Sequence, residues 1–154
     1  MKVAIHRLSS TGVGEKIGSV VMSDTPGGLL VQPDICSLPP GFHGFHIHQF
    51  PLLGPAGGKA GGGAGQHYDP LRTGHHLGPY KMGHLGDLPR LLVGENGCAT
   101  TPVVAPHLTT LMVLHRSVII HLYGDNYSDY PLKDGGGRVR IAGGIIMKNC
   151  PYCR

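Results

Sequence analysis

"HGFHIHQF" (residues 43–50) alternates histidine with apolar residues over much of its length, the period-two pattern of a β-strand. Side chains two positions apart in a strand lie on the same face. His46 and His48 are therefore expected to point in one direction, while His43 falls on the opposite parity. The stretch predicts a strand that presents a pair of imidazoles.

Similar β-branched runs recur along the chain, separated by turn signals such as "DTPGG" (24–28) and "GENG" (94–97). No segment has a convincing amphipathic helical pattern. The pattern predicts an all-β fold, an eight-stranded antiparallel Greek-key barrel or sandwich. The expected strands are residues 2–8, 16–23, 28–33, 45–50, 90–93, 98–104, 117–123 and 138–147.

The bulk composition is that of an ordinary globular protein. The 154 residues, 40% of them hydrophobic and 14% charged, are expected to form one domain, 1–154. The net charge of +4 is modest and no Lys/Arg run exceeds two residues, which argues against nucleic-acid or membrane binding. The start "MKVAIHRL" alternates like a strand and lacks a secretory signal pattern. We therefore expect a cytoplasmic protein, with a mature periplasmic form as the alternative.

Two long intervals between the expected strands point to function. Residues 51–89 are rich in Gly, His and Pro and contain few apolar residues to fold around, so a metal ion is a natural core for them. This long loop carries His67, His75, His76, His84 and Asp87. The second interval, residues 124–137, is likewise too long to be a plain turn.

Histidine-rich ligation without a nearby thiolate favours Cu(II) or Zn(II). "HLGD" (84–87) places an imidazole and a carboxylate three residues apart, a pair suited to zinc. His121 follows an apolar run in a later expected strand, where an imidazole needs a partner. More than four ligands are available, so two metals fit better than one.

With these residues in this order, nearly the whole chain resembles the copper/zinc superoxide dismutase family, and its bacterial branch in particular. The resemblance implies copper and zinc as cofactors, superoxide as substrate and a homodimer. The matching segments are "HGFHIH" (43–48), "GQHYDP" (65–70), "GHHLGPY" (74–80), "GHLGDLP" (83–89), "IIHLYGDNYSD" (119–129) and "GGGRVRIAGGII" (135–146).

The resemblance also implies a role for each matched residue, with one imidazole bridging the two metals. The register of the following "GP" selects His76 over His75 as a ligand. The implied copper ligands are His46, His48, His67 and His121. The implied zinc ligands are His67, His76, His84 and Asp87.

Three further residues receive roles from the same match. Asp125 is implied to link a copper-ligand histidine to a zinc-ligand histidine, and Arg140 to dock the anion, with Arg138 as its rival. His67 and Arg140 are the implied catalytic residues. Residues 124–137 are implied to form the active-site loop, in which Lys133 is a candidate steering charge. The expected reaction converts superoxide to dioxygen and hydrogen peroxide; the alternative is a non-catalytic copper/zinc protein for metal storage or delivery.

The four cysteines depart from the family pattern. By register, Leu53 and Gly143 occupy the positions of the family's intrachain disulfide, so the sequence predicts a chain that lacks it, which fits a reducing compartment. Cys36 and Cys98 are expected to be free thiols, with a disulfide between them as the alternative. "CPYC" (150–153) matches the glutaredoxin tetrapeptide but follows a strand, and is expected to be an incidental tail; a vicinal disulfide or a copper-capturing site are the alternatives.

Overall fold

The computed structural model describes residues 1–148, and "CPYC" lies outside this range. Short helices are confined to the connections: η1 (Gly62–Ala64), α1 (Thr110–Val113) and η2 (Lys133–Gly136). No helix within residues 1–148 has the length and apolar character needed to cross a membrane. The strands are β1 (Lys2–Ser9), β2 (Gly12–Thr25), β3 (Gly28–Ile35), β4 (Gly41–His43), β5 (Phe45–His48), β6 (Leu91–Val93), β7 (Val103–Ala105), β8 (Arg116–His121) and β9 (Arg140–Ile146).

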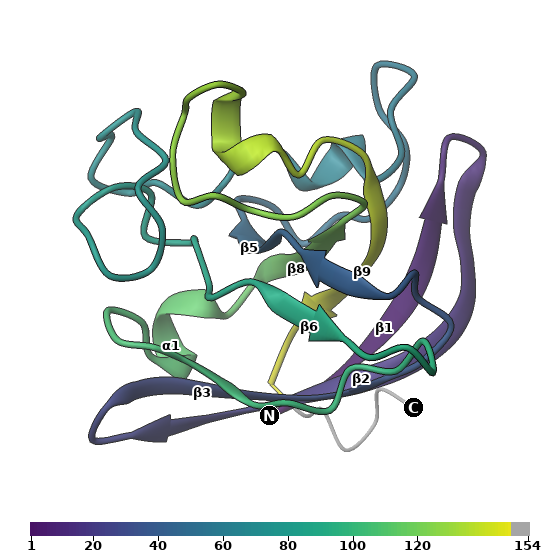
Figure 1. Ribbon diagram of the computed structural model, residues 1–154, viewed down its shortest axis with the longest axis horizontal. Helices are drawn as coiled ribbons and strands as arrows, with labels where there is room; N and C mark the ends of the chain where they lie inside the picture. The colour runs from purple at the N-terminus through teal and green to yellow at the C-terminus, as the bar shows by residue number, and fades with distance from the viewer. Residues whose placement is uncertain (149–154) are drawn as a thin grey trace.

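The strands form two antiparallel sheets that curl around one core (Figure 1). The larger has the order β5-β8-β9-β1-β2-β3-β7, and the smaller pairs β4 with β6. The predicted all-β antiparallel fold is confirmed. In Figure 1 the long connections gather on one side of the strands, away from β2 and β3.

The expected strand 45–50 ends earlier than predicted, and an additional strand precedes it. Gly44 separates β4 from β5, and these two strands pair with different partners, β6 and β8. A Cβ on Gly44 would lie 3.0 Å from Cε1 of His46, so glycine suits this close approach. The histidine pair therefore begins immediately after the point where the chain passes from one sheet to the other.

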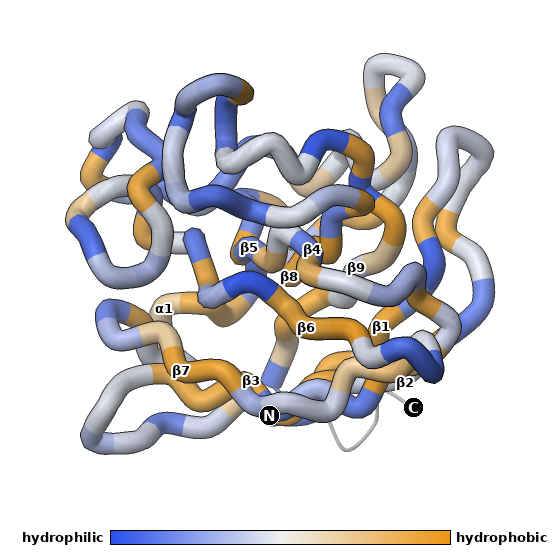
Figure 2. Tube along the Cα trace, in the orientation of Figure 1, coloured by the Kyte–Doolittle hydropathy of each residue, from blue (hydrophilic) through white to orange (hydrophobic). Residues whose placement is uncertain are grey.

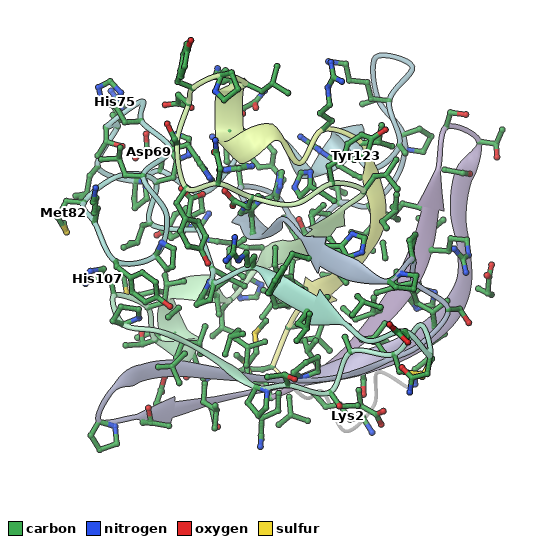
Figure 3. The ribbon with its side chains drawn as sticks, in the orientation of Figure 1. Lys2, Asp69, His75, Met82, His107 and Tyr123 are labelled. Carbon is green, nitrogen blue, oxygen red and sulfur yellow. A yellow bond between two sulfur atoms is a disulfide. The ribbon has the colours of Figure 1, made fainter. Side chains whose placement is uncertain are left out.

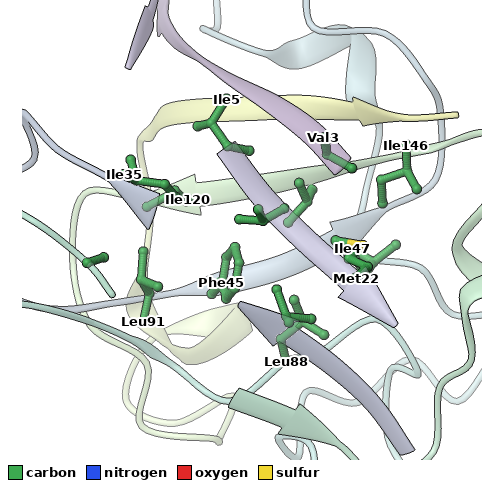
Figure 4. Packing of buried hydrophobic residues seen from close by; sticks show 14 of the residues in the cluster. Val3, Ile5, Met22, Ile35, Phe45, Ile47, Leu88, Leu91, Ile120 and Ile146 are labelled. Atoms are coloured by element: carbon green, nitrogen blue, oxygen red, sulfur yellow. The ribbon is translucent and has the colours of Figure 1, made fainter. Parts of the chain in front are cut away.

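The core is apolar and lies inside the curled sheets (Figure 4). Phe45 and Ile47 of β5 are fully buried in it, together with Ile120 of β8. The alternate residues of β5, His46 and His48, are equally buried but belong to the other face of the strand. Figure 2 shows hydrophobic residues concentrated on the strands and hydrophilic ones on the connections. The strand is thus buried on both faces, and only one of them is apolar.

Cys36 and Cys98 form a disulfide, so the prediction of a chain without intrachain disulfide cysteines was wrong, as was the expectation of two free thiols. The cause is strand pairing. Ile35 at the end of β3 pairs with Ala99 in an isolated antiparallel bridge. That bridge brings the neighbouring Cα atoms of Cys36 and Cys98 to 4.0 Å. The argument for a reducing compartment loses its support with this bond.

A second apolar cluster attaches the 51–89 loop to the sheet. Leu53 is 7% exposed and packs with Leu8, Ala64 and Ile119. The neighbouring Leu52 is 58% exposed and faces solvent. Only one of the two leucines therefore anchors the loop.

Candidate metal centre

Strand pairing positions the first histidines of the site. His46 and His48 lie on β5, whose edge is paired by the 51–89 loop through isolated bridges from His46 to Asp87 and from His48 to His67. On the other side of β5, β8 ends at His121. Backbone hydrogen bonding therefore brings together five of the residues that the sequence selected.

Three overlapping sets of four side chains place their donor atoms within 4.8 Å of one another. His67 belongs to all three, and its ring centroid lies 4.0 Å from that of His46. The sets are His46, His48, His67 and His121; His46, His67, His76 and Asp87; and His67, His76, His84 and Asp134.

The first set presents nitrogen lone pairs that face each other. Nδ1 of His48 lies 3.0 Å from the carbonyl oxygen of Gly65, and Nδ1 of His121 lies 3.1 Å from that of Arg138. A carbonyl oxygen only accepts, so each Nδ1 is the donor and each Nε2 is left unprotonated in the neutral ring. The two Nε2 atoms are 3.3 Å apart. Such an arrangement fits a cation that both can ligate.

Burial keeps these rings neutral. It lowers the pKa of His48 and of His121 well below the usual value, and the charges of neighbouring histidines lower both further. Burial and then the charge of His46 lower the pKa of His67 to about 4, although Asp87 opposes the shift. Neutral imidazole is the form that binds copper or zinc.

Around Asp87, three buried polar atoms that could ligate a metal lie close together. Its Oδ2 lies 2.8 Å from Nδ1 of His76 and 3.6 Å from Nδ1 of His84. Among the described residues, these three buried atoms have no hydrogen-bond partner. Buried polar atoms without partners are rare and costly. Two nitrogens and an oxygen aimed at one small volume match the preference of zinc for N and O ligands.

Asp125 joins the two sides. Its Oδ2 is 2.7 Å from Nε2 of His46, and its Oδ1 is 2.7 Å from Nε2 of His76. Both Nε2 atoms donate to the carboxylate, which leaves each Nδ1 for a metal. The loop 124–137 packs tightly here, because a Cβ on Gly135 would overlap Asp125.

The carboxylates in turn control the charge of His76. Burial alone would lower the pKa of His76, but its hydrogen bond with Asp125 and the neighbouring carboxylate of Asp87 raise that pKa to about 10. Burial opposes ionisation of both carboxylates as well, yet hydrogen bonds with the histidines hold the pKa of Asp87 and of Asp125 below the usual range. The two carboxylates therefore favour the protonated form of His76 when no metal is bound.

Arg140 is fixed at the mouth of the first set. Its Nη1 and Nη2 donate to the carbonyl oxygens of Gly61 and Gly65, each at 2.7 Å. It lines a cavity of about 290 Å³ into which His67 and His121 also face. The cavity carries four cationic side chains and one carboxylate, namely Lys59, Lys133, Arg138, Arg140 and Asp134. A small anion fits this charge.

Exposure distinguishes the rival residues in the two pairs that the sequence left to be compared, His75 and His76, and Arg138 and Arg140. His75 lies at the outer edge of the molecule, exposed (Figure 3), whereas His76 is fully buried. Arg138 is exposed and Arg140 is half-buried. Both arginines line the same cavity, but only for Arg140 does the structure give side-chain hydrogen bonds that fix the guanidinium.

Sequence reasoning gave no role to His43. Its Nδ1 lies 2.7 Å from the carbonyl oxygen of His121, and its Nε2 lies 2.7 Å from that of Pro39. The ring thus ties the strand end that carries His121 to the connection before β4. The sequence indicated only that His43 lies on the opposite face of the strand from His46 and His48. It did not indicate which groups His43 contacts.

The family model for copper/zinc superoxide dismutase matches residues 16–146. The chain belongs to the copper/zinc superoxide dismutase family. The superoxide dismutase [Cu-Zn] of Brucella abortus biovar 1 is 47% identical over 150 residues, which are 94% of this chain and 86% of that protein. The enzyme of Escherichia coli K12 is also 47% identical, over 94% of this chain and 87% of its own.

Solved structures agree with this membership. The copper/zinc superoxide dismutase from Brucella abortus superposes with a TM-score of 0.91 at 44% identity, covering 95% of this chain and 98% of that one. The monomeric enzyme from Salmonella enterica gives 0.85 at 48% identity, with the same coverage. This superoxide dismutase therefore takes copper and zinc as cofactors and superoxide as substrate.

Proposed function

We propose that this chain, as one domain spanning 1–154, disproportionates superoxide at two adjacent metal sites that share His67. His46, His48, His67 and His121 are the copper ligands, and His67, His76, His84 and Asp87 are the zinc ligands. The observation that carries the proposal is the position of His67, which belongs to every one of the donor sets. The 51–89 loop holds the metals, and the 124–137 loop forms a wall of the channel.

Copper, when bound, supplies the one-electron redox change, and zinc supplies none of its own. The protein contributes the binding of the anion. Arg140 is held by two carbonyl groups with its guanidinium lining the cavity, so it receives superoxide without reorganising. Lys133 lines the same cavity and raises the encounter rate of the anion.

His67 provides the proton. Its Nδ1 lies 2.9 Å from Oδ1 of Asp87, which orients the ring so that Nε2 is on the copper side. We assign to Nε2 of His67 one of the two protons taken up when superoxide gains one electron; solvent supplies the second proton, and the product leaves as hydrogen peroxide. Two superoxide anions and two protons then give one dioxygen and one hydrogen peroxide.

We also propose that two chains form a homodimer through the β4–β6 sheet. Phe42 and Leu92 are cross-strand partners there, 49% and 41% exposed, and Tyr123, whose carbonyl oxygen accepts from the N–H of Gly44, is 52% exposed. Apolar side chains gathered on one sheet suit association with a second copy. Light scattering should then give twice 16.3 kDa, falling to the monomer mass in Leu92→Asp. The monomer mass at every concentration contradicts the dimer.

The test of the main proposal measures metal content and superoxide consumption together in wild type, His46→Ala and His75→Ala. We expect His46→Ala to lose copper and activity, because it removes a buried donor. His75→Ala, a change of the exposed neighbour of a proposed ligand, should keep both. Wild-type protein that binds both metals but consumes no superoxide would favour the storage or delivery function instead.

A further inference from the structure

Asp134 is an acidic residue of the 124–137 loop that has no role in the proposed sites, yet it faces them. Its carboxylate lies within 4.8 Å of the donor nitrogens of His67, His76 and His84. Its Oδ1 is buried and has no hydrogen-bond partner among residues 1–148. An unpartnered, buried carboxylate oxygen beside three imidazole nitrogens is a favourable ligand for a metal ion.

The backbone holds Asp134 in this position. Its N–H donates to Oδ1 of Asp129 at 3.0 Å, and Oδ2 of the same Asp129 accepts from the N–H of His76 at 2.9 Å. One carboxylate thus couples the main chain at Asp134 to the main chain at His76. Asp134 has φ 55° and ψ 36°, a left-handed conformation that Asp tolerates better than most residues. The position of the Asp134 side chain is therefore set by the hydrogen bonds and the conformation of its backbone.

Two of the carboxylates next to these imidazoles, Asp87 and Asp134, differ in access. Asp87 is 1% exposed, whereas Asp134 is half-buried. Asp134 lines the cavity of about 290 Å³ that contains Arg140, and also a second cavity of about 340 Å³ that contains His84 and Asp69. A cation entering through either cavity meets Asp134 on its way to the buried donors.

We propose that Asp134 is a second carboxylate ligand of the zinc side of the centre, in addition to Asp87. This rests on the proposed zinc site at His67, His76 and His84. Zinc takes carboxylate oxygen as a ligand, and its coordination can expand from four to five at sites that keep an open position. Asp134 adds a negatively charged donor from the solvent side, which strengthens the hold on the cation and provides its first contact during loading.

The experiment compares zinc affinity and the cobalt spectrum of the full chain in Asp134→Asn and Asp134→Gly. Asn keeps the shape of the side chain and tolerates the left-handed backbone, and Gly relaxes it, so neither variant is expected to disturb folding. Competition with a chromophoric chelator should show zinc affinity reduced about tenfold or more in both variants. Cobalt(II) in the zinc site should absorb more strongly in the visible range, because loss of a fifth ligand leaves a tetrahedral ion.

Two further variants make the result decisive. Asp69→Asn removes a carboxylate from the same cavity wall, but the Asp69 oxygens are already used by Thr73 and Gly74. It should leave the cobalt spectrum unchanged. Asp87→Asn removes the buried ligand and should weaken zinc binding strongly.

Wild-type affinity and spectrum in both Asp134 variants, with affinity lost in Asp87→Asn, would overturn the role of Asp134 and leave the zinc site intact. An equal loss in Asp69→Asn and Asp134→Asn would also overturn it, since general charge would then explain both. If Asp87→Asn also binds zinc normally, the zinc site itself is wrong.

Discussion

At Asp125, one carboxylate accepts hydrogen bonds from two imidazoles, at 2.7 Å each. In Asp125→Asn, one of the two Nε2–H groups of His46 and His76 must face an amide NH2, so one ring loses its orientation. We expect the affinity for copper and zinc to fall about 10–100-fold. Chelator competition for each metal measures it.

The matched change is Asp34→Asn, which removes one carboxylate from an exposed position of β3. It should keep the wild-type affinities. Unchanged metal binding in Asp125→Asn would mean that the rings are oriented by packing alone and that the carboxylate is dispensable.

The raised pKa of His76, about 10, makes zinc binding dependent on pH. Zinc displaces the proton from Nδ1, so affinity should strengthen with rising pH up to about 10, by about tenfold per pH unit for each proton released. In the metal-free protein the same shift stabilises the fold fully below pH 6.5, and this stability is lost as the pH rises through about 10. Calorimetry in buffers of different ionisation enthalpy at pH 7.5 counts the protons. Binding that releases none contradicts the assignment of an imidazolium.

At the scale of elements, the attachment of the 51–89 loop depends on Leu53. Leu53→Ala leaves a cavity among Leu8, Ala64 and Ile119, and the free energy of unfolding should fall by about 2–5 kcal/mol. Leu52→Ala is the natural comparison, because Leu52 is 58% exposed and its loss should change stability by less than about 0.5 kcal/mol. Urea unfolding of both variants tests the difference. Equal effects would show that the loop is not anchored at Leu53.

The Cys36–Cys98 disulfide links the end of β3 to the segment before β7, across a sequence separation of 62 residues. Restriction of the unfolded chain by such a loop stabilises a protein by about 4 kcal/mol in the chain-entropy account. The double change Cys36→Ser/Cys98→Ser should reduce the free energy of unfolding by up to that amount. Wild-type protein under a reductant should approach the variant, and identical stabilities with and without the bond would contradict the prediction.

At the scale of the whole molecule, the sequence was sufficient wherever local periodicity governs structure. The alternation at His46 and His48 predicted a strand that presents both imidazoles on one side, and the apolar runs predicted most of the sheet. The short strand β4 was missed because its three residues carry no period of their own and pair only through β6. The boundary at Gly44 depends on contacts that no local pattern contains.

Long-range pairing explains the other errors and omissions. The proximity of Cys36 and Cys98 follows from the bridge between Ile35 and Ala99, which sequence order alone does not reveal. The expectation of an active-site loop at 124–137 did not single out Asp134, because its approach to His76 depends on the hydrogen bonds of Asp129. Local sequence patterns therefore do not identify residues whose positions depend on contacts with a segment far away in the chain.

Metal and disulfide should stabilise this molecule independently. The first histidine pair lies on β5, and Cys36 follows the end of β3. In the order of the larger sheet, four strands lie between β5 and β3, namely β8, β9, β1 and β2. Distant sites without shared partners have additive effects. Zinc at a thousandfold excess over its dissociation constant contributes about 4 kcal/mol, or about 8–16 °C in melting temperature for a chain of this size.

A chelator should therefore lower the melting temperature of the zinc-loaded wild type by about 8–16 °C. It should lower the melting temperature of Cys36→Ser/Cys98→Ser by the same amount, although that variant melts at a lower temperature to begin with. The reason is that zinc provides a partner for buried polar atoms of the 51–89 loop that have none. The disulfide makes no contact with these atoms. Differential scanning calorimetry of four samples, each protein with and without chelator, measures both terms. A wild-type melting temperature that the chelator leaves unchanged contradicts a structural role for zinc, and a shift that vanishes in the serine variant contradicts independence.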